Sequence, residues 1–163
     1  MAAETLDVAS MIPAKFEPKR KNRWVLMIEG IDAYLIKSTK RPTITTEEQE
    51  IPFINSRRYL AGKTSFEAMD VTLHDAIAPS GAQQVMEWVR AHYESVSGRS
   101  GYADFYKRDI QLKLIDPVGT VIELWDIKGA FIMSATFGDL AYDGAEPMEI
   151  SLSLRYDNAV LQY

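Results

Sequence analysis

The chain has 163 residues, of which 47% are hydrophobic and 25% are charged, and its formal net charge is -5. These values are ordinary for one globular domain that buries a sizeable core, and they argue against a disordered chain or a membrane protein. The complete absence of cysteine excludes disulfides, thiol nucleophiles and the common structural zinc sites.

Residues 1–22 predict an extended N-terminal arm, because they show no helical or strand period and contain two prolines. We expect no secretory signal in them, since Glu4 and Asp7 interrupt the basic and apolar regions that such a signal needs. The arm leads into a basic collar that consists of Lys15, Lys19, Arg20, Lys21 and Arg23. Nucleic-acid surfaces typically interleave basic with several aromatic side chains, so we interpret this collar as a partner contact or a solvated segment.

Two short apolar segments, residues 24–28 and 34–38, flank a turn at Gly30 and predict a first β-hairpin. Residues 43–62 then predict a projecting loop or β-hairpin, in which acidic residues precede an apolar stretch. Exposed apolar side chains surrounded by charge usually mark a contact surface. The predicted contact residues of this segment are Ile51, Pro52, Phe53, Ile54, Arg57, Arg58 and Tyr59.

The next part of the chain changes from a strand period to a helical period. In residues 66–74 apolar and polar side chains alternate, which predicts a strand with one buried face. Residues 80–98 predict a helix, because Ser80 and Gln83 form a capping box and Gly98 takes the C-terminal cap position. Its apolar residues recur at helical spacing, so we expect the helix to pack across a sheet.

Residues 110–115 and 121–131 predict a further hairpin, and residues 148–156 predict a terminal strand with unbroken apolar and polar alternation. One helix and about seven strands offer too few helices for parallel crossovers. The predicted fold class is therefore mainly β (α+β), an antiparallel β-sandwich or barrel with one packed α-helix. We assign residues 23–163 to this single domain.

The sequence offers few residues for catalysis or metal binding. Asp139 and Glu149 are the candidates for paired carboxylates acting on a glycoside, but an acidic solvent-facing surface explains them better, because nothing marks either as desolvated. His74 and His92 have no histidine-rich or carboxylate-rich neighbourhood in the sequence, which disfavours a metal site. We predict that the chain is not an enzyme and has no cofactor and no metal site.

Several segments carry a likeness to a known family. They are Arg41-Pro42, residues 50–55, Tyr59-Leu60-Ala61-Gly62, Ser65-Phe66, residues 69–75, the helix around Trp88, and residues 150–157. In this order, and over nearly the full length, the chain resembles the tail tube protein of contractile-tailed bacteriophages. The start departs from the family, because residues 1–22 are longer and more basic, which leaves the docking place of the arm open.

The resemblance implies a structural virion protein. Its homohexameric rings would join their sheets into one continuous barrel and stack, through contacts that include residues 43–62, into a helical tube that conducts DNA into the host. Assembly would take place in the host cytoplasm, with the sheath, baseplate or tube initiator, tape measure and tail terminator as partners and without a membrane. An acidic lumen would repel passing DNA instead of binding it. The lumen-facing candidates are Asp70, Glu123, Asp139, Asp143 and Glu149.

Two other functions stay open at this point. A ring protein of a type VI secretion tube, or a baseplate protein that initiates the tube, would share the fold and differ in its partners. A monomeric β-barrel that binds a small ligand belongs to another class, and Trp24, Trp88 and Trp125 would be the candidates for its pocket. We place these tryptophans in the core, and the projecting apolar segment argues against a monomeric ligand barrel.

Overall fold

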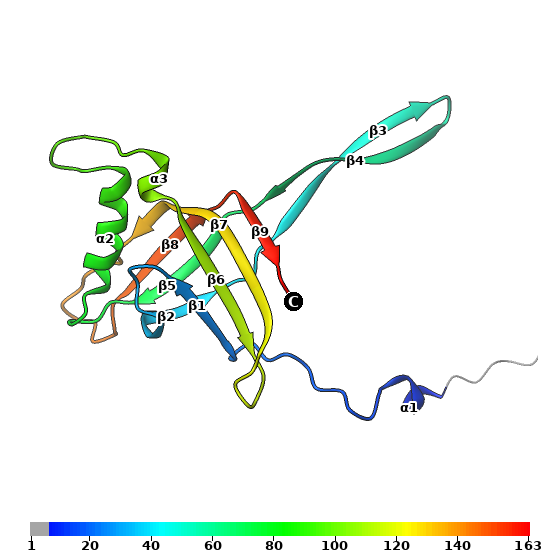
Figure 1. Ribbon diagram of the computed structural model, residues 1–163, viewed down its shortest axis with the longest axis horizontal. Coiled ribbons are helices and arrows are strands. Elements are labelled where there is room, and N and C mark those ends of the chain that lie inside the picture. Colours follow the sequence, from blue (N-terminus) through cyan, green and yellow to red (C-terminus); the bar gives the residue numbers. More distant parts are fainter. Residues whose placement is uncertain (1–6) are drawn as a thin grey trace, which may run out of the picture.

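The computed structural model describes residues 7–163, and most of its strands belong to one curled antiparallel sheet (Figure 1). The sheet runs in the order β1-β6-β7-β8-β5-β2, and β9 pairs with β7. Its strands are β1 (Trp24–Ile28), β2 (Ile36–Thr39), β5 (Met69–His74), β6 (Arg108–Ile115), β7 (Val121–Thr136), β8 (Glu149–Arg155) and β9 (Asn158–Leu161). All of these pairings are antiparallel, so the predicted mainly β architecture is confirmed.

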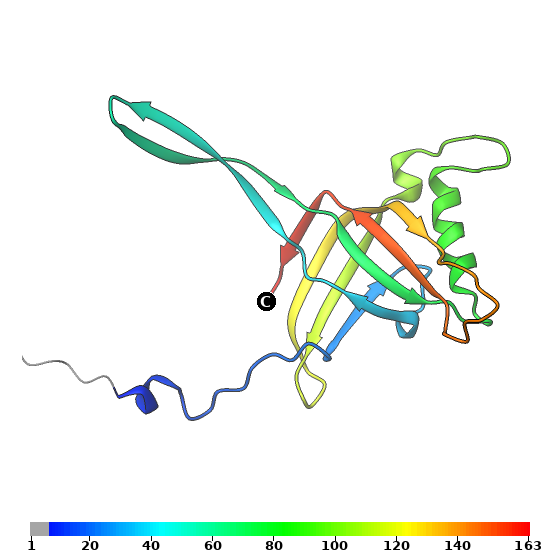
Figure 2. The same cartoon turned by 180° about the vertical axis from the view of Figure 1, so that it is seen from behind.

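The long strand β7 bends the sheet into two layers around one core (Figure 2). Its first half pairs with β6 and β9, and its second half pairs with β8. Gly129 lies near the bend with a φ of 66°, where a Cβ would collide with the Asp157 carboxylate. The inward rows of both layers form the core, whose buried members include Leu26, Leu112, Ile127, Val71, Leu73, Ile150, Leu152 and Leu154. The alternation predicted for the terminal strand is therefore confirmed in β8.

The helix α2 (Gly81–His92) covers one end of the core, as Figure 1 shows. Ser80 caps its N-terminus by accepting a hydrogen bond, 3.3 Å long, from a backbone N–H of the first turn. Trp88 is 1% exposed, and its indole donates to the carbonyl oxygen of Tyr106, in α3 (Ala103–Tyr106), at 2.7 Å. The packed, serine-capped helix that the sequence predicts is thus present.

The end of this helix differs from the prediction. The helix stops at His92, so its predicted continuation to Gly98 is wrong. Residues 93–100 instead form a small hairpin closed by backbone hydrogen bonds. Tyr93 and Val96, which continue the apolar stripe in the sequence, are 46% and 93% exposed. An apolar stripe stabilises a helix only where it has a surface to cover, and here the chain has passed the edge of the core.

The strands β1 and β2 do not pair with each other, so the predicted first hairpin is wrong. β1 pairs with β6 and β2 pairs with β5, which places them at the two edges of the sheet. A turn at Gly30, with a φ of 82°, and the 3-10 helix η1 (Ala33–Leu35) carry the chain across the open side between these edges. Within residues 7–163, β1 pairs only with β6, and β2 pairs only with β5. The second edge of each of these two strands is therefore free to pair with another chain.

The N-terminal arm leaves the sheet at β1 and is exposed throughout residues 7–22 (Figure 1). It contains one helical turn, α1 (Val8–Met11), which the sequence pattern does not predict. Asp7 caps this turn by accepting a hydrogen bond of 3.1 Å from the N–H of Ala9. The predictions for residues 1–6, including the argument from Glu4, lie outside the described residues. None of the helices described is long and apolar enough to span a bilayer.

Candidate assembly surfaces

The strands β3 (Ile44–Phe53) and β4 (Ser56–Phe66) form a separate two-stranded sheet that reaches away from the main sheet (Figure 1). Every residue of β3 is exposed, and so are the residues of β4 apart from Gly62 and Phe66. An isolated two-stranded hairpin is at best marginally stable in water. The projecting segment is thus a hairpin, and the part of the chain that the structure describes leaves both of its faces uncovered.

Cross-strand pairing gives the hairpin one apolar and one polar face, because residues directly opposite each other share a face. The apolar hairpin face carries Ile51, Phe53 and Leu60, whose exposed fractions are 49%, 71% and 54%, together with Gln49, Ser56 and Arg58. On the opposite face, the Arg57 Nε lies 3.0 Å from the Glu50 Oε1. Tyr59 on this opposite face is also 58% exposed, so the two faces differ in degree, and the row of Ile51, Phe53 and Leu60 is the more apolar surface left for another molecule to cover.

The predicted contact residues do not lie on one surface. They fall into three groups, with Ile51, Phe53 and Arg58 on the apolar face, Pro52, Arg57 and Tyr59 on the polar face, and Ile54 at the turn. The sequence prediction missed Leu60, which pairs with Gln49 and extends the apolar face towards the root. Side chains on a strand alternate between its two faces, so Leu60 lies on the same face as Arg58. The sequence could have identified Leu60 in this way if the register of the turn had been known. Contact with a neighbour stays a prediction for the whole set.

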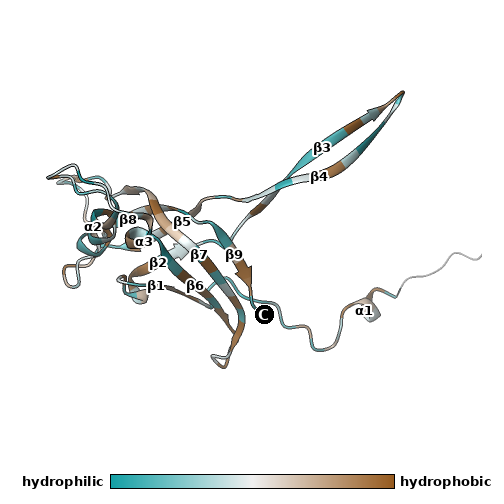
Figure 3. Ribbon diagram, turned by 45° about the horizontal axis from the view of Figure 1, so that its top comes forward, coloured by the Kyte–Doolittle hydropathy of each residue, from teal (hydrophilic) through white to brown (hydrophobic). Residues whose placement is uncertain are grey.

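The tip of the hairpin carries a strained residue. Ile54 has a φ of 50°, in the left-handed region that costs a non-glycine residue about 1–2 kcal/mol. Its side chain is 87% exposed, and Figure 3 shows the apolar colouring at this tip beyond a largely polar stretch of β3. A strained, apolar and exposed tip has the features of a docking element.

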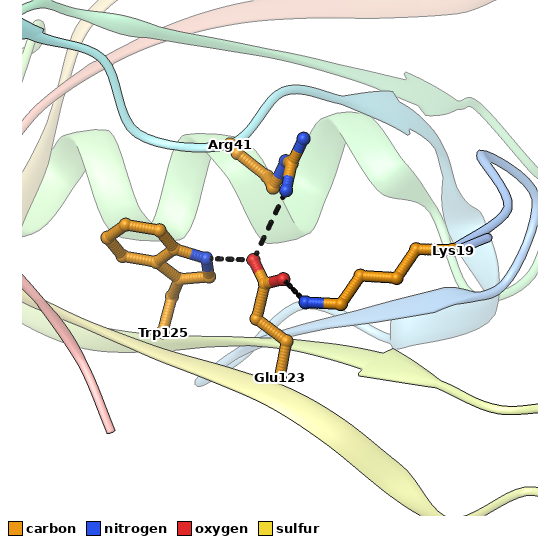
Figure 4. A network of polar contacts seen from close by, with 4 residues as sticks. All are labelled: Lys19, Arg41, Glu123 and Trp125. Carbon is orange, nitrogen blue, oxygen red and sulfur yellow. Dashed lines mark hydrogen bonds and ion pairs between the residues drawn. The ribbon is translucent and has the colours of Figure 1, made fainter. Parts of the chain in front are cut away.

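A buried carboxylate lies where both projections leave the sheet (Figure 4). Glu123 of β7 is 3% exposed. Lys19 of the arm and the indole of Trp125 donate hydrogen bonds to it, and the Arg41 Nη1 lies 3.5 Å from its Oε1. Arg41 stands between β2 and β3, just before the hairpin begins. Glu123 thus ties the root of the arm to the root of the hairpin, and we call these four residues the Glu123 cluster.

The charge of Glu123 is stabilised by its partners. Burial acts to raise the pKa of Glu123, but the hydrogen bonds from Lys19 and Trp125 and the charges of Lys19 and Arg41 outweigh it. The pKa therefore lies below its ordinary value, and the side chain is ionised at neutral pH. The burial contradicts the prediction that Glu123 faces a lumen. The alternation of β7 places Glu123 on the inward face, in the same row as Trp125 and Ile127.

The outward row of β5 and β8 forms a polar sheet face. Its cross-strand pairs are Asp70 with Ser153, Thr72 with Ser151, and His74 with Glu149. Lys37 donates a hydrogen bond to Glu149, and this bond holds the pKa of Glu149 below its ordinary value. Arg155 adds a further exposed cation. This face therefore carries two acids, Asp70 and Glu149, and two bases, Lys37 and Arg155, and the lumen-facing position of Asp70 and Glu149 stays a prediction.

The loop between β7 and β8, residues 137–148, holds the remaining lumen candidates, Asp139 and Asp143. Both are exposed, and the loop contains Glu146 but no Lys or Arg. It also exposes two large apolar side chains, since Leu140 is 81% exposed and Tyr142 is fully exposed. We call residues 137–148 the acidic loop. The general acid of a glycosidase needs a raised pKa, whereas the hydrogen bond from Lys37 holds the pKa of Glu149 below its ordinary value, so Glu149 lacks the feature that marks such an acid.

The tryptophans and histidines singled out in the sequence take structural positions. Trp88 lies in the core, and Trp24 and Trp125 are partly buried against it, as expected. His92 packs edge-on against the Tyr106 ring with 4.6 Å between the ring centroids. His74 lies on the polar sheet face, on a different element.

Solved structures match this architecture. No protein-family model matches the chain, and no curated protein aligns with it significantly in sequence. A chain in the cryo-EM structure of the anti-feeding prophage cap, a tube-terminating cap, superposes with a TM-score of 0.72 at 19% identity. The match covers 96% of this chain and 99% of that one. This chain has the tail-tube fold.

Two further structures support the same fold. A chain in the sheath/tube terminator of PVC, an extracellular contractile injection system, superposes with a TM-score of 0.70 at 18% identity, covering 92% of this chain and 100% of its own. The SPP1 tail tube superposes with a TM-score of 0.52 at 16% identity, covering 88% and 78%. The resemblance to tail tube proteins is therefore confirmed at the level of the fold.

Proposed function

We propose that this chain is a structural, non-enzymatic subunit of a tail or injection tube, in which hexameric rings stack into a hollow cylinder. The observation that carries the proposal is the projecting amphipathic hairpin on a tail-tube fold. Its exposed apolar face and its strained tip need a covering surface, and a second copy of the chain supplies one. The free edges of β1 and β2 support ring closure, because pairing with neighbouring copies would satisfy their backbone groups.

In this proposal the polar sheet face lines the lumen, and phage DNA passes through it into the host without specific binding. A surface of hydroxyl groups and matched charges offers few net contacts to phosphate, so it would hold the DNA only weakly. Asp70 is the leading lumen candidate, because it is exposed and its charge has no ion-pair partner among residues 7–163. Glu149 on the same face remains a candidate, Asp139 and Asp143 lie on the acidic loop outside this face, and the burial of Glu123 argues against it.

A lysine on the polar sheet face should make the tube retain DNA. In assembled Asp70→Lys tubes, phosphate contacts inside the lumen should raise the amount of nuclease-resistant DNA at least about tenfold over wild type, and added salt should reverse the effect. Glu87→Lys, on the exposed side of α2, makes the same charge change. It should bind DNA only where nuclease can digest it. Equal protection in both variants would show that the polar sheet face does not line the lumen.

The tube proposal has a direct test. The purified chain should form rings or hollow tubes in negative-stain electron microscopy, and light scattering should report a mass far above that of a monomer. A baseplate component supplied as a nucleus provides the second condition, because tube growth can need one. A chain that stays monomeric in both conditions would contradict the proposal and would favour a monomeric ligand-binding barrel.

The virion or particle location and the remaining partners belong to the same proposal. We propose that the assembled tube contacts a sheath, a baseplate or tube initiator, a tape measure and a tail terminator. A ring protein of a type VI secretion tube, or a tube initiator, is the second candidate, since a shared fold does not distinguish them. Co-assembly with a sheath protein on long tubes favours the tail-tube subunit, whereas growth that stops at one or two rings favours an initiator or a cap.

A further inference from the structure

A basic pocket lies at the end of the sheet where β1 and β7 begin and β2 and β6 end. Its volume is about 400 Å³, and its floor is formed by Trp24, Leu112 and Leu114. Its rim carries five cations, namely Lys19, Arg20, Lys21, Lys40 and Arg41. Figure 4 shows that two of them, Lys19 and Arg41, already bind Glu123. The pocket therefore combines an apolar floor with a rim on which three cations, Arg20, Lys21 and Lys40, do not bind Glu123.

These three cations have no close ion-pair partner among the described residues. Arg20 has only the exposed Glu17, whose Oε1 lies 3.9 Å from the Arg20 Nε, and within residues 7–163 neither Lys21 nor Lys40 forms an ion pair. Thr39 also lines the pocket, and its hydroxyl is buried without a hydrogen-bond partner among the described residues. A buried polar group without a partner usually indicates a missing ligand or contact. The pocket thus calls for an occupant with several acidic groups and an apolar part.

The acidic loop has the complementary composition. It carries three carboxylates and no cation, and it exposes Leu140 and Tyr142 between them. The loop follows the last residue of β7, whereas the basic pocket lies beside the first residues of β7. The two surfaces are therefore at opposite ends of the same strand and cannot meet within one copy.

We propose that the acidic loop of one copy docks into the basic pocket of the next copy along the tube. Leu140 and Tyr142 would cover Trp24 and the leucines of the floor, while the carboxylates pair with Arg20, Lys21 and Lys40. A contact between unlike surfaces is heterologous, so it repeats from ring to ring and sets one direction of growth. Complementary charge also steers the encounter and makes it salt-dependent. This inference rests on the proposed tube function and names its stacking contact.

A charge-reversal cycle tests the contact on the full chain. Lys21→Glu/Lys40→Glu and Asp139→Lys/Asp143→Lys should each stop growth at single rings and raise the concentration needed for tubes at least about tenfold. In an equimolar mixture of the two proteins, every contact between unlike copies joins opposite charges, so the mixture should grow tubes of alternating copies, and the quadruple variant should also restore tube growth. Arg90→Glu/Arg99→Glu, which removes two exposed cations near the end of α2, is the matched control and should grow like wild type.

The outcomes separate the stacking contact from the tube function. If wild type forms tubes and both charge reversals grow as well as the control, the stacking contact is wrong and the tube function stands. If wild type does not form tubes, self-association of the full-length monomer in low salt is followed by light scattering and tryptophan fluorescence. Self-association that Lys21→Glu/Lys40→Glu weakens at least about tenfold supports the contact. Absence of self-association in low salt overturns it.

Discussion

Replacing Phe53 by aspartate should leave a folded monomer that no longer polymerises. Phe53 is 71% exposed and packs on nothing in the core, so the free energy of unfolding should change by less than about 0.5 kcal/mol. In a contact between copies, the change removes an aromatic anchor and buries an unpaired charge, which costs about 2 kcal/mol or more. Because every copy repeats the contact, the concentration needed for tube growth should rise at least about 30-fold.

Two variants make this experiment decisive. Val96→Asp places the same charge at an apolar site that is 93% exposed and lies in the small hairpin after α2, and it should polymerise like wild type. Leu60→Asp lies on the apolar hairpin face and should reproduce the defect. Thermal unfolding checks that each variant is folded, and light scattering with electron microscopy measures assembly. Normal tubes from both Phe53→Asp and Leu60→Asp would show that the apolar hairpin face makes no essential contact.

Removing both cations from the Glu123 cluster should lower the free energy of unfolding more than removing the acid does. Lys19→Met/Arg41→Met leaves a carboxylate that is 3% exposed with only the Trp125 indole as a partner. An uncompensated buried charge of this kind should lower the free energy of unfolding by about 3 kcal/mol at neutral pH. Adding Glu123→Gln to this variant removes the charge and should restore most of the loss. Urea unfolding monitored by tryptophan fluorescence measures all three proteins.

The same variant should respond to pH in the opposite direction from wild type. In wild type the folded-state pKa of Glu123 is lowered, so its stabilisation is present above the unfolded value of about 4.3 and is lost as the pH falls below it. Without Lys19 and Arg41, burial dominates and raises that pKa above the unfolded value. The stability of the variant relative to wild type should then increase as the pH falls from about 6 to about 4. Parallel pH profiles for the two proteins would contradict this account of the cluster.

The period of the side chains explains why much of the fold was predictable. The alternation in residues 148–156 identifies the buried row of β8, and Ser80 marks the start of α2, because both signals are local. The end of α2 was not predictable in the same way. An apolar stripe indicates a helix only when there is a surface to cover, and the sequence does not say where the core ends.

The long-range features show the limit of local patterns. β1 and β2 are close in sequence, yet they lie at opposite edges of the sheet, because each has a better partner elsewhere in the chain. Glu123 was named as a lumen-facing candidate, because the resemblance to tail tube proteins implied an acidic lumen. Its partner Lys19 is 104 residues away, and no spacing rule connects the two. Of the candidate contact surface, the apolar hairpin tip was visible in the sequence, whereas its division into two faces required the register.

One strand, β7, runs from the Glu123 cluster to the acidic loop and belongs to both layers of the sheet. A force applied between the two ends of β7 is carried by its covalent backbone and not by the side-chain packing of the core. The hydrogen bonds that join β7 to β6, β8 and β9 lie across this direction, so they are loaded together in shear and not broken one after another. The geometry therefore lets the subunit resist a pull along β7 through many hydrogen bonds at once.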